Sequence, residues 1–322
     1  MTLLRLVFAI LLVALGSGRA LATTWDEPWH REVVVKATSF GLYEVVKSGP
    51  GALTLQRIKH IAGDETGATI EVNGFYALRL TSRSADHGPE FSLPVGTRAY
   101  FHLQRSGGAW AVATPSAGYA PLRRDGKVAG TYRFSAHQAL VDPALYEDTQ
   151  RCIFMVLHGR KGCEASLAAF VGTELAKPAE GLGEDSTSAG REEFFRQHVA
   201  LETAGLVHIP IPDATLERFL AKADTHVQLS AVRSLAGSPR SDRAERLMRF
   251  VEDDQARLPA RMLAALLLQE TGAHEMKQRL QDYAARASEE EAGLGMEIMD
   301  PRIGTRFPDN LREAVRLAAA QL

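Results

Sequence analysis

Two different hydrophobic periodicities divide this chain. Between residues 33 and 134, short runs rich in β-branched and aromatic residues alternate with polar positions, as at Leu53 and Leu55 against Thr54 and Gln56. A period of two is typical of half-buried strands. Between residues 191 and 286, apolar positions recur every three or four residues, which is typical of helices. We therefore predict an α+β protein with two domains, a β module followed by helices.

The β module is predicted to be a small antiparallel barrel or sandwich within residues 23–140. Its strands are separated by glycine turns rather than by helices, for example at Gly107-Gly108. Closely spaced strands of this kind favour a closed barrel or a sandwich. The long first pair of strands, the Ile-x-x-Ile-Ala-Gly-Asp stretch at 58–64 and the Pro-x-Gly-Thr-Arg-x-Tyr-Phe stretch at 94–101 resemble OB-like or netrin-like secreted modules. Netrin-like metalloproteinase inhibitors use an N-terminal cysteine, which the expected mature start at Thr23 lacks.

The helical part repeats itself. Residues 216–220, 247–251 and 280–284 each place leucine first and an aromatic residue fourth, at spacings of 31 and 33 residues. Each copy is paired with an alanine-rich helix that ends at a glycine. We expect a left-handed C-cap at each of these glycines, which are Gly205, Gly237 and Gly272. Such a period predicts a short solenoid of stacked helical pairs over residues 191–322, with the last helix as its cap.

One helix of this region carries a more specific pattern. Asp224, Val227, Ala231 and Leu235 have the spacing of a HEAT-repeat signature, with Gln228 where arginine is usual. The helical part therefore resembles a HEAT-like array. The resemblance implies a non-catalytic scaffold whose concave surface binds proteins or peptides.

The first 22 residues read as a signal peptide. Arg5 precedes an apolar run at 6–15, and Ala20-Leu21-Ala22 forms a small-x-small cleavage site. The run is shorter than the roughly 20 apolar residues that span a bilayer. We expect an exported protein, periplasmic or extracellular, with no stable membrane span after cleavage. The alternative is an uncleaved signal anchor.

Export changes the interpretation of the two cysteines, Cys152 and Cys163. An even pair in an oxidising compartment favours a disulfide, which here would staple a helical hairpin at residues 141–180. Two free thiols, or a metal or redox site that includes His158, are the alternatives. The glycine- and serine-containing stretch at 181–190 is predicted to be a linker or mobile loop.

Composition excludes one class of partner. The chain has 322 residues, 37 basic and 39 acidic, so its formal net charge is −2. It shows no basic stripe with interleaved aromatic residues, and we therefore expect no nucleic-acid partner. No cofactor is predicted.

Candidate chemistry is sparse, and no catalytic residue is predicted. Tyr119, Tyr132, Arg133 and His137 are a speculative rim for a peptide or glycan, although aromatic residues at this spacing more often belong to a core. We expect an exported, non-catalytic scaffold that binds an envelope protein or peptide. The alternatives are a small-ligand or glycan binder using the β module, and a metal-dependent hydrolase of an envelope polymer using His87, Glu90 or His137.

Overall fold

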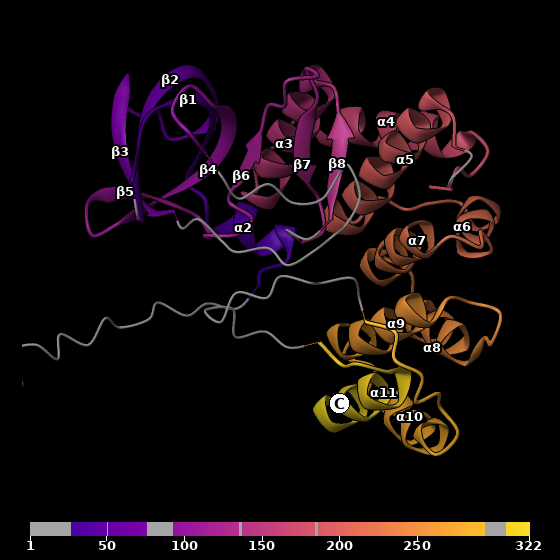
Figure 1. Ribbon diagram of the computed structural model, residues 1–322. Coiled ribbons are helices and arrows are strands. Elements are labelled where there is room, and N and C mark those ends of the chain that lie inside the picture. The colour runs from indigo at the N-terminus through magenta and orange to yellow at the C-terminus, as the bar shows by residue number, and fades with distance from the viewer. Residues whose placement is uncertain (1–26, 50, 76–92, 135–136, 184–185, 294–306) are drawn as a thin grey trace, which may run out of the picture.

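The computed structural model describes residues 27–49, 51–75, 93–134, 137–183, 186–293 and 307–322. A barrel occupies one end of the molecule, and helices stack away from it (Figure 1). The predicted signal peptide, together with His87 and Glu90, lies outside the described residues. Within the described part, no helix is long and apolar enough to cross a membrane.

The N-terminal module is a closed five-stranded barrel. Its strands follow the order β1-β2-β3-β5-β4, and β4 pairs back with β1. All pairs are antiparallel except β3 and β5, which run parallel, and the predicted OB-like barrel is thereby confirmed. The strands are β1 (Ser39–Gly49), β2 (Gly51–Gly63), β3 (Thr69–Phe75), β4 (Arg98–Ser106) and β5 (Ala109–Val112).

The barrel has its own filled interior. Tyr43, Phe101, Trp110 and Tyr119 are buried there together with aliphatic residues from every strand. Tyr119 belongs to β6 (Tyr119–Pro121), a short strand that pairs with β4. Because the inward positions of all these strands are apolar, burying them together drives closure.

A hairpin and two helices connect the barrel to the array. They are β7 (Val128–Thr131), β8 (Gln138–Val141), α3 (Pro143–Leu157) and α4 (Glu164–Ala176). The predicted disulfide between Cys152 and Cys163 is present, with its Cα atoms 5.2 Å apart, and it ties α3 to the first turn of α4. Closing this short loop stabilises the folded state by about 2 to 3 kcal/mol in the chain-entropy model.

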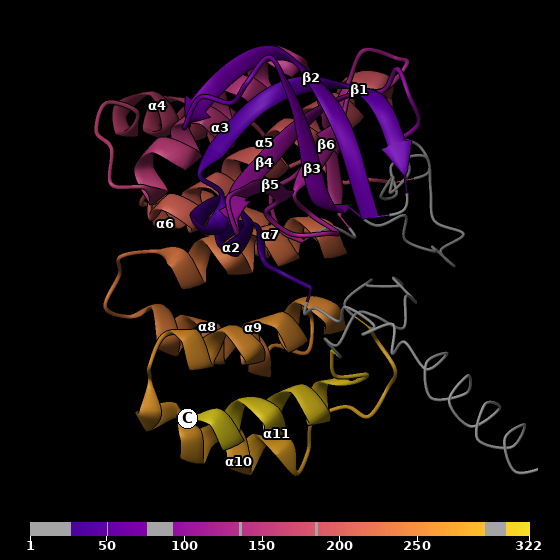
Figure 2. The ribbon, with the colours of Figure 1, turned by 90° about the vertical axis from the view of Figure 1, so that its left-hand side faces the viewer.

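The C-terminal part is a stack of helical pairs (Figure 2). Helices α5, α7, α9 and α11 pack one on the next, and α6, α8 and α10 lie beside them. The three matching sequence phrases fall on α6, α8 and α10, where their leucine and aromatic side chains are buried as predicted. The helices are α5 (Ser188–Val207), α6 (Asp213–Leu220), α7 (Thr225–Gly237), α8 (Arg243–Glu252), α9 (Leu258–Glu270), the 3₁₀ turn η1 (His274–Met276), α10 (Lys277–Ala284) and α11 (Leu311–Gln321).

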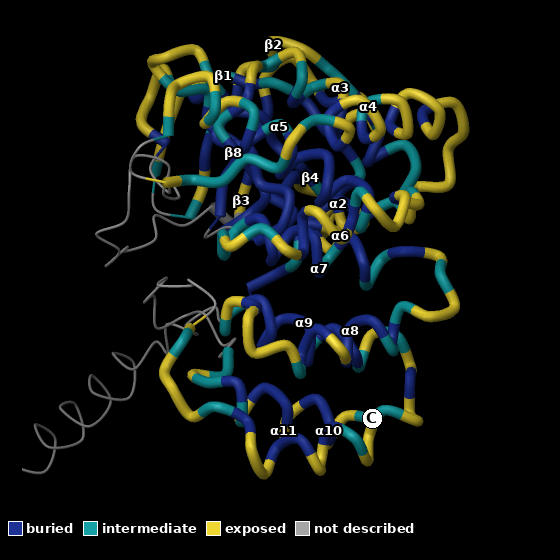
Figure 3. The backbone as a smooth tube through the Cα atoms, turned by 90° about the vertical axis from the view of Figure 1, so that its right-hand side faces the viewer, coloured by how far each residue is buried: buried dark blue, intermediate teal, exposed yellow. Residues whose placement is uncertain are grey.

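The barrel and the helices share one apolar core. The short helix α2 (His30–Lys36) buries Val33 and Val34 against α3, and Tyr100 on the barrel wall packs on Tyr146 of α3. The same cluster of buried side chains continues through α5, α7 and α9 to α11. Figure 3 colours the buried residues of the chain dark blue. The two parts are therefore fixed relative to each other by burial.

Two of the three repeat glycines have a role that differs from the predicted one. Gly272 has φ of +67° and is left-handed as expected, but Gly205 and Gly237 are not, and that prediction is wrong for them. A Cβ on Gly237 would lie 2.2 Å from the carbonyl oxygen of Gly205, and one on Gly205 would lie 2.8 Å from that of Arg233. These glycines let α5 and α7 meet backbone to backbone. The left-handed cap of α5 is His208, with φ of 59°.

We expect Gly237→Ala to lower the free energy of unfolding by about 1 to 3 kcal/mol or more, because the added methyl forces two helices apart. Gly172→Ala is the matched control. Gly172 is an exposed helical residue with open space around its Cβ position, so alanine there should be neutral or stabilise by up to about 1 kcal/mol. Urea unfolding of both variants measures the difference. Equal effects would contradict the close-packing role.

Candidate functional site

A buried ion-pair cluster lies where the β7–β8 hairpin meets α5 and α7. The Arg133 side chain is fully buried, and its Nε donates to Oε1 of Glu202 at 2.7 Å. Its Nη2 donates to the Ser230 hydroxyl at 2.6 Å and to the His226 carbonyl at 3.3 Å. An arginine from the hairpin is thus bound to two successive inner helices.

Glu202 is the centre of this cluster. Its other oxygen, Oε2, accepts from Arg233 Nε at 2.7 Å, and the Arg233 guanidinium lies 4.4 Å from the Trp29 ring. Burial by itself would raise the pKa of Glu202, but the charges of Arg133 and Arg233 outweigh it and lower the pKa to about 2. One carboxylate therefore holds two arginines from two different elements.

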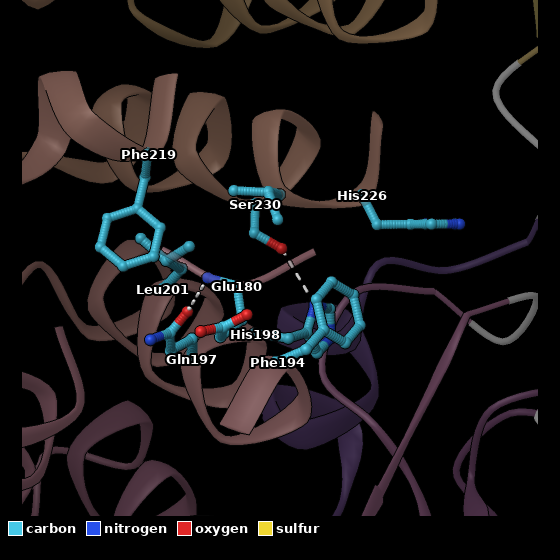
Figure 4. A pocket seen from close by; sticks show the side chains of 9 residues that line it. Glu180, Phe194, Gln197, His198, Leu201, Phe219, His226 and Ser230 are labelled. Carbon is cyan, nitrogen blue, oxygen red and sulfur yellow. Dashed lines mark hydrogen bonds between the residues drawn. The ribbon is translucent and has the colours of Figure 1, made fainter. Parts of the chain in front are cut away.

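Ser230 and His198 lie next to this cluster, and their geometry can be compared with that of a catalytic pair. The Ser230 Oγ is 2.9 Å from His198 Nδ1 (Figure 4). It is also 2.9 Å from Glu202 Oε1. In a nucleophilic triad the carboxylate orients the histidine rather than the serine. Here Glu202 accepts a hydrogen bond from the serine instead, and Arg133 donates a hydrogen bond to the same hydroxyl.

Access to Ser230 is also closed. Its side chain is fully buried, and the adjoining cavity has a volume of about 10 Å³, which is room for about one water molecule. Burial lowers the pKa of His198 to about 3, so its ring is neutral at pH 7. These residues form a structural network without a path for a substrate.

The four residues predicted as a ligand rim are all buried. Tyr119 is in the barrel interior against Phe101, and the Tyr132 hydroxyl is 2.6 Å from Thr149 Oγ1. Arg133 belongs to the ion-pair cluster, and the His137 ring lies 4.5 Å from the rings of both His198 and His226. Three of the four, Tyr132, Arg133 and His137, therefore lie where the β7–β8 hairpin meets the helices. None of the four is exposed at the surface to a ligand. The geometry favours the alternative that they are core residues.

A groove with polar and apolar lining residues lies between α2 and the C-terminal ends of α5, α7 and α9. It offers about 390 Å³ to water-sized groups. Sequence reasoning missed it because its residues come from separate elements that only the tertiary structure brings together. We call it the junction groove; it is lined by Trp29, Arg31, Glu32, Gly205, Leu206, His208, Arg233, Ala236, Gly237, Arg243, Leu267 and Glu270.

Helix ends determine the polar contacts in the junction groove. The last carbonyls of a helix lack partners within the helix and carry partial negative charge. Arg31 donates to the Leu206 carbonyl at 3.0 Å, and Arg243 donates to the Ser238 carbonyl at 3.1 Å. The Nδ1 of His208 is 2.7 Å from the Gly237 carbonyl, so it donates there. These three basic side chains therefore bind the carbonyl groups at the C-terminal ends of α5 and α7.

Two carboxylates complete the groove, Glu32 on α2 and Glu270 at the end of α9. Neither forms an ion pair with any described residue. Desolvation raises the pKa of Glu270 and the charge of Glu32 adds to the rise, whereas the charges of Arg233 and Arg31 oppose it; the residue as a whole stays exposed. The groove thus holds carboxylates that lack a cationic partner of their own.

No group of three or more His, Cys, Asp or Glu side chains within the described chain could hold a metal ion. Comparisons of the sequence with protein-family models and curated proteins, and of the fold with solved structures, find no match.

We expect Glu202→Gln to lower the free energy of unfolding by about 3 to 5 kcal/mol, because it leaves buried Arg133 without its counter-charge. Glu192→Gln changes an exposed carboxylate on the same helix and should have an effect below about 0.5 kcal/mol. Chemical unfolding of both variants compares them. A small loss for Glu202→Gln would show that Arg133 finds another partner.

Acid should destabilise the fold well before pH 4. Burial lowers the pKa of His30 to about 4 and that of His198 to about 3, whereas both titrate near 6.5 when unfolded. As the pH falls below 6.5, these histidines become protonated in the unfolded chain but stay neutral in the folded chain. The free energy of unfolding therefore falls. Glu202 adds a further loss between pH 4.5 and about 2. Urea unfolding from pH 7.5 to 4.5 tests this, and a flat profile would contradict it.

Proposed function

We propose that this chain is an exported, non-catalytic binding protein that holds a segment of an envelope protein or peptide in the junction groove. The observation that carries the proposal is the groove itself, with about 390 Å³ of space formed by α2 and three successive inner helices. Concave sites between packed elements are where proteins usually bind ligands. This groove is large enough for a few side chains of an extended peptide.

The chemistry of the groove suits binding better than catalysis. Its lining contains no hydroxyl or thiol nucleophile, and the nearby serine is sealed in the ion-pair cluster. The partly exposed Trp29 and Ala236 supply apolar surface above the buried Leu206 and Leu267, and charged side chains surround it. An apolar floor with a polar rim is the usual anatomy of a protein-binding site.

The architecture supports the same function. Stacked helical pairs resemble HEAT-like arrays, which act as protein-binding scaffolds. The disulfide is compatible with an exported protein, and a periplasmic or extracellular location follows if residues 1–22 are cleaved. The β module supports a ligand-binding alternative less well, because aromatic side chains fill its interior.

A photo-crosslinking experiment in intact cells tests the proposal. The photo-reactive residue p-benzoylphenylalanine is introduced at His208 in the groove, and at Arg316, an exposed residue of α11, as the control position. We expect a discrete adduct from position 208 and none from position 316.

A second pair of variants checks that the adduct depends on the groove. Ala236→Trp fills the groove, and we expect it to remove the adduct at position 208 without lowering the melting temperature. Ala320→Trp places the same bulk on an exposed face of α11 and should leave the adduct unchanged. Equal adducts from both positions, or an adduct that survives Ala236→Trp, would refute binding in the groove.

A further inference from the structure

We infer that the segment bound in the junction groove presents a lysine or arginine side chain, with its positive group facing Glu32 and Glu270. This inference rests on the proposed binding function and adds the chemistry of the bound residue. It follows from how the charges of the groove are already used.

The basic side chains of the groove are already engaged. Arg31, Arg243 and His208 each donate to a carbonyl at a helix end, and Arg233 pairs with Glu202 while its guanidinium lies against Trp29. An anionic ligand would have to compete with these contacts or share the remaining N–H groups. The cations are therefore poorly placed to define the ligand.

The carboxylates are in the opposite position. Among the residues that the structure describes, neither Glu32 nor Glu270 has an ion-pair or hydrogen-bond partner on its side chain. The C-terminal end of α9 also lies here, no basic side chain of the described residues binds its carbonyls, and helix C-termini favour positive charge. Partial desolvation strengthens an ion pair that a ligand would form with Glu270. A positive group thus satisfies what the protein leaves unpaired.

The apolar walls suit the remainder of such a side chain. Lysine and arginine carry three or four methylene groups that pack on apolar surface while the charged end stays polar. Trp29 and Ala236, which are partly exposed, offer that surface in the same groove. A small inorganic cation would leave these walls uncovered, and two carboxylates alone are a poor cage for it.

Peptide pools of defined charge test the inference on the full-length protein. The probes are N-acetylated, C-amidated heptapeptides with uncharged randomised flanks and a central lysine or arginine, compared with matched pools that carry norleucine, citrulline or glutamate at the centre. Binding is followed by the indole N–H signal of Trp29, which is identified by its loss in Trp29→Phe. We expect the basic pool to shift this signal at concentrations about tenfold lower than the neutral pools.

Two matched variants assign the effect to Glu270. Glu270→Gln should weaken binding of the basic pool about tenfold and leave the neutral pools unchanged. Glu275→Gln alters an exposed carboxylate outside the groove and should change nothing. Equal binding of all pools, tighter binding of the glutamate pool, no shift with any pool, or insensitivity to Glu270→Gln would each overturn the inference. The position-dependent adduct at residue 208 would still report on the groove, so a failed charge preference is distinguishable from a failed binding function.

Discussion

The fold depends on the buried contact of Glu202 with Arg133 and Arg233. Arg133 comes from the hairpin that follows the barrel, Glu202 from α5 and Arg233 from α7, so one carboxylate fixes three elements. A buried charge is tolerated only when it is paired and hydrogen-bonded, and here each member meets that condition. The interaction is specific because a shift of either helix would leave a charge uncompensated. Apolar burial supplies most of the free energy, and separating the members of this cluster would leave a buried charge unpaired.

The junction groove follows from the same arrangement. Arg233 reaches from Glu202 to Trp29 and so connects the ion-pair cluster with the segment that leads into α2. Gly205 and Gly237 bring α5 and α7 close together, and the ends of these helices then lie side by side beneath α2. The concave surface is thus formed by elements that are rigidly held. A preorganised groove loses little entropy when it binds a ligand, which suits a scaffold.

The contrast between the two polar regions is the reason that we propose binding rather than catalysis. The serine, histidine and carboxylate that suggest catalysis by their composition are buried and hydrogen-bonded to one another. Glu32 and Glu270, which have no ion-pair partner among the described residues, belong to the groove. Polar side chains that are hydrogen-bonded to one another in the interior stabilise a fold. Polar side chains left unpaired at a concave surface are available to a ligand.

Local patterns in the sequence determined the elements. Alternation at Leu53 and Leu55 predicted strand, the leucine and aromatic positions of the repeat predicted the buried faces of α6, α8 and α10, and the pair Cys152 and Cys163 predicted the staple. These features depend on periodicity and spacing along the chain, which are visible without a structure. The parallel pairing of β3 with β5 was not visible, because strand order depends on contacts distant in sequence.

Only the tertiary structure decided the site. Arg133 and Glu202 are 69 residues apart, and no local pattern marks them as partners. The close-packing role of Gly237 is visible only when Gly205 lies against it. Glu270 becomes a candidate ligand-binding residue only because α2 forms the other side of the groove. The physical reason is that a helix or strand is specified by neighbours a few residues away, whereas a buried ion pair and a groove are specified by packing between elements. Local sequence therefore specifies the helices, the strands and the disulfide. Their packing specifies which polar residues have partners within the protein and which remain accessible to a ligand.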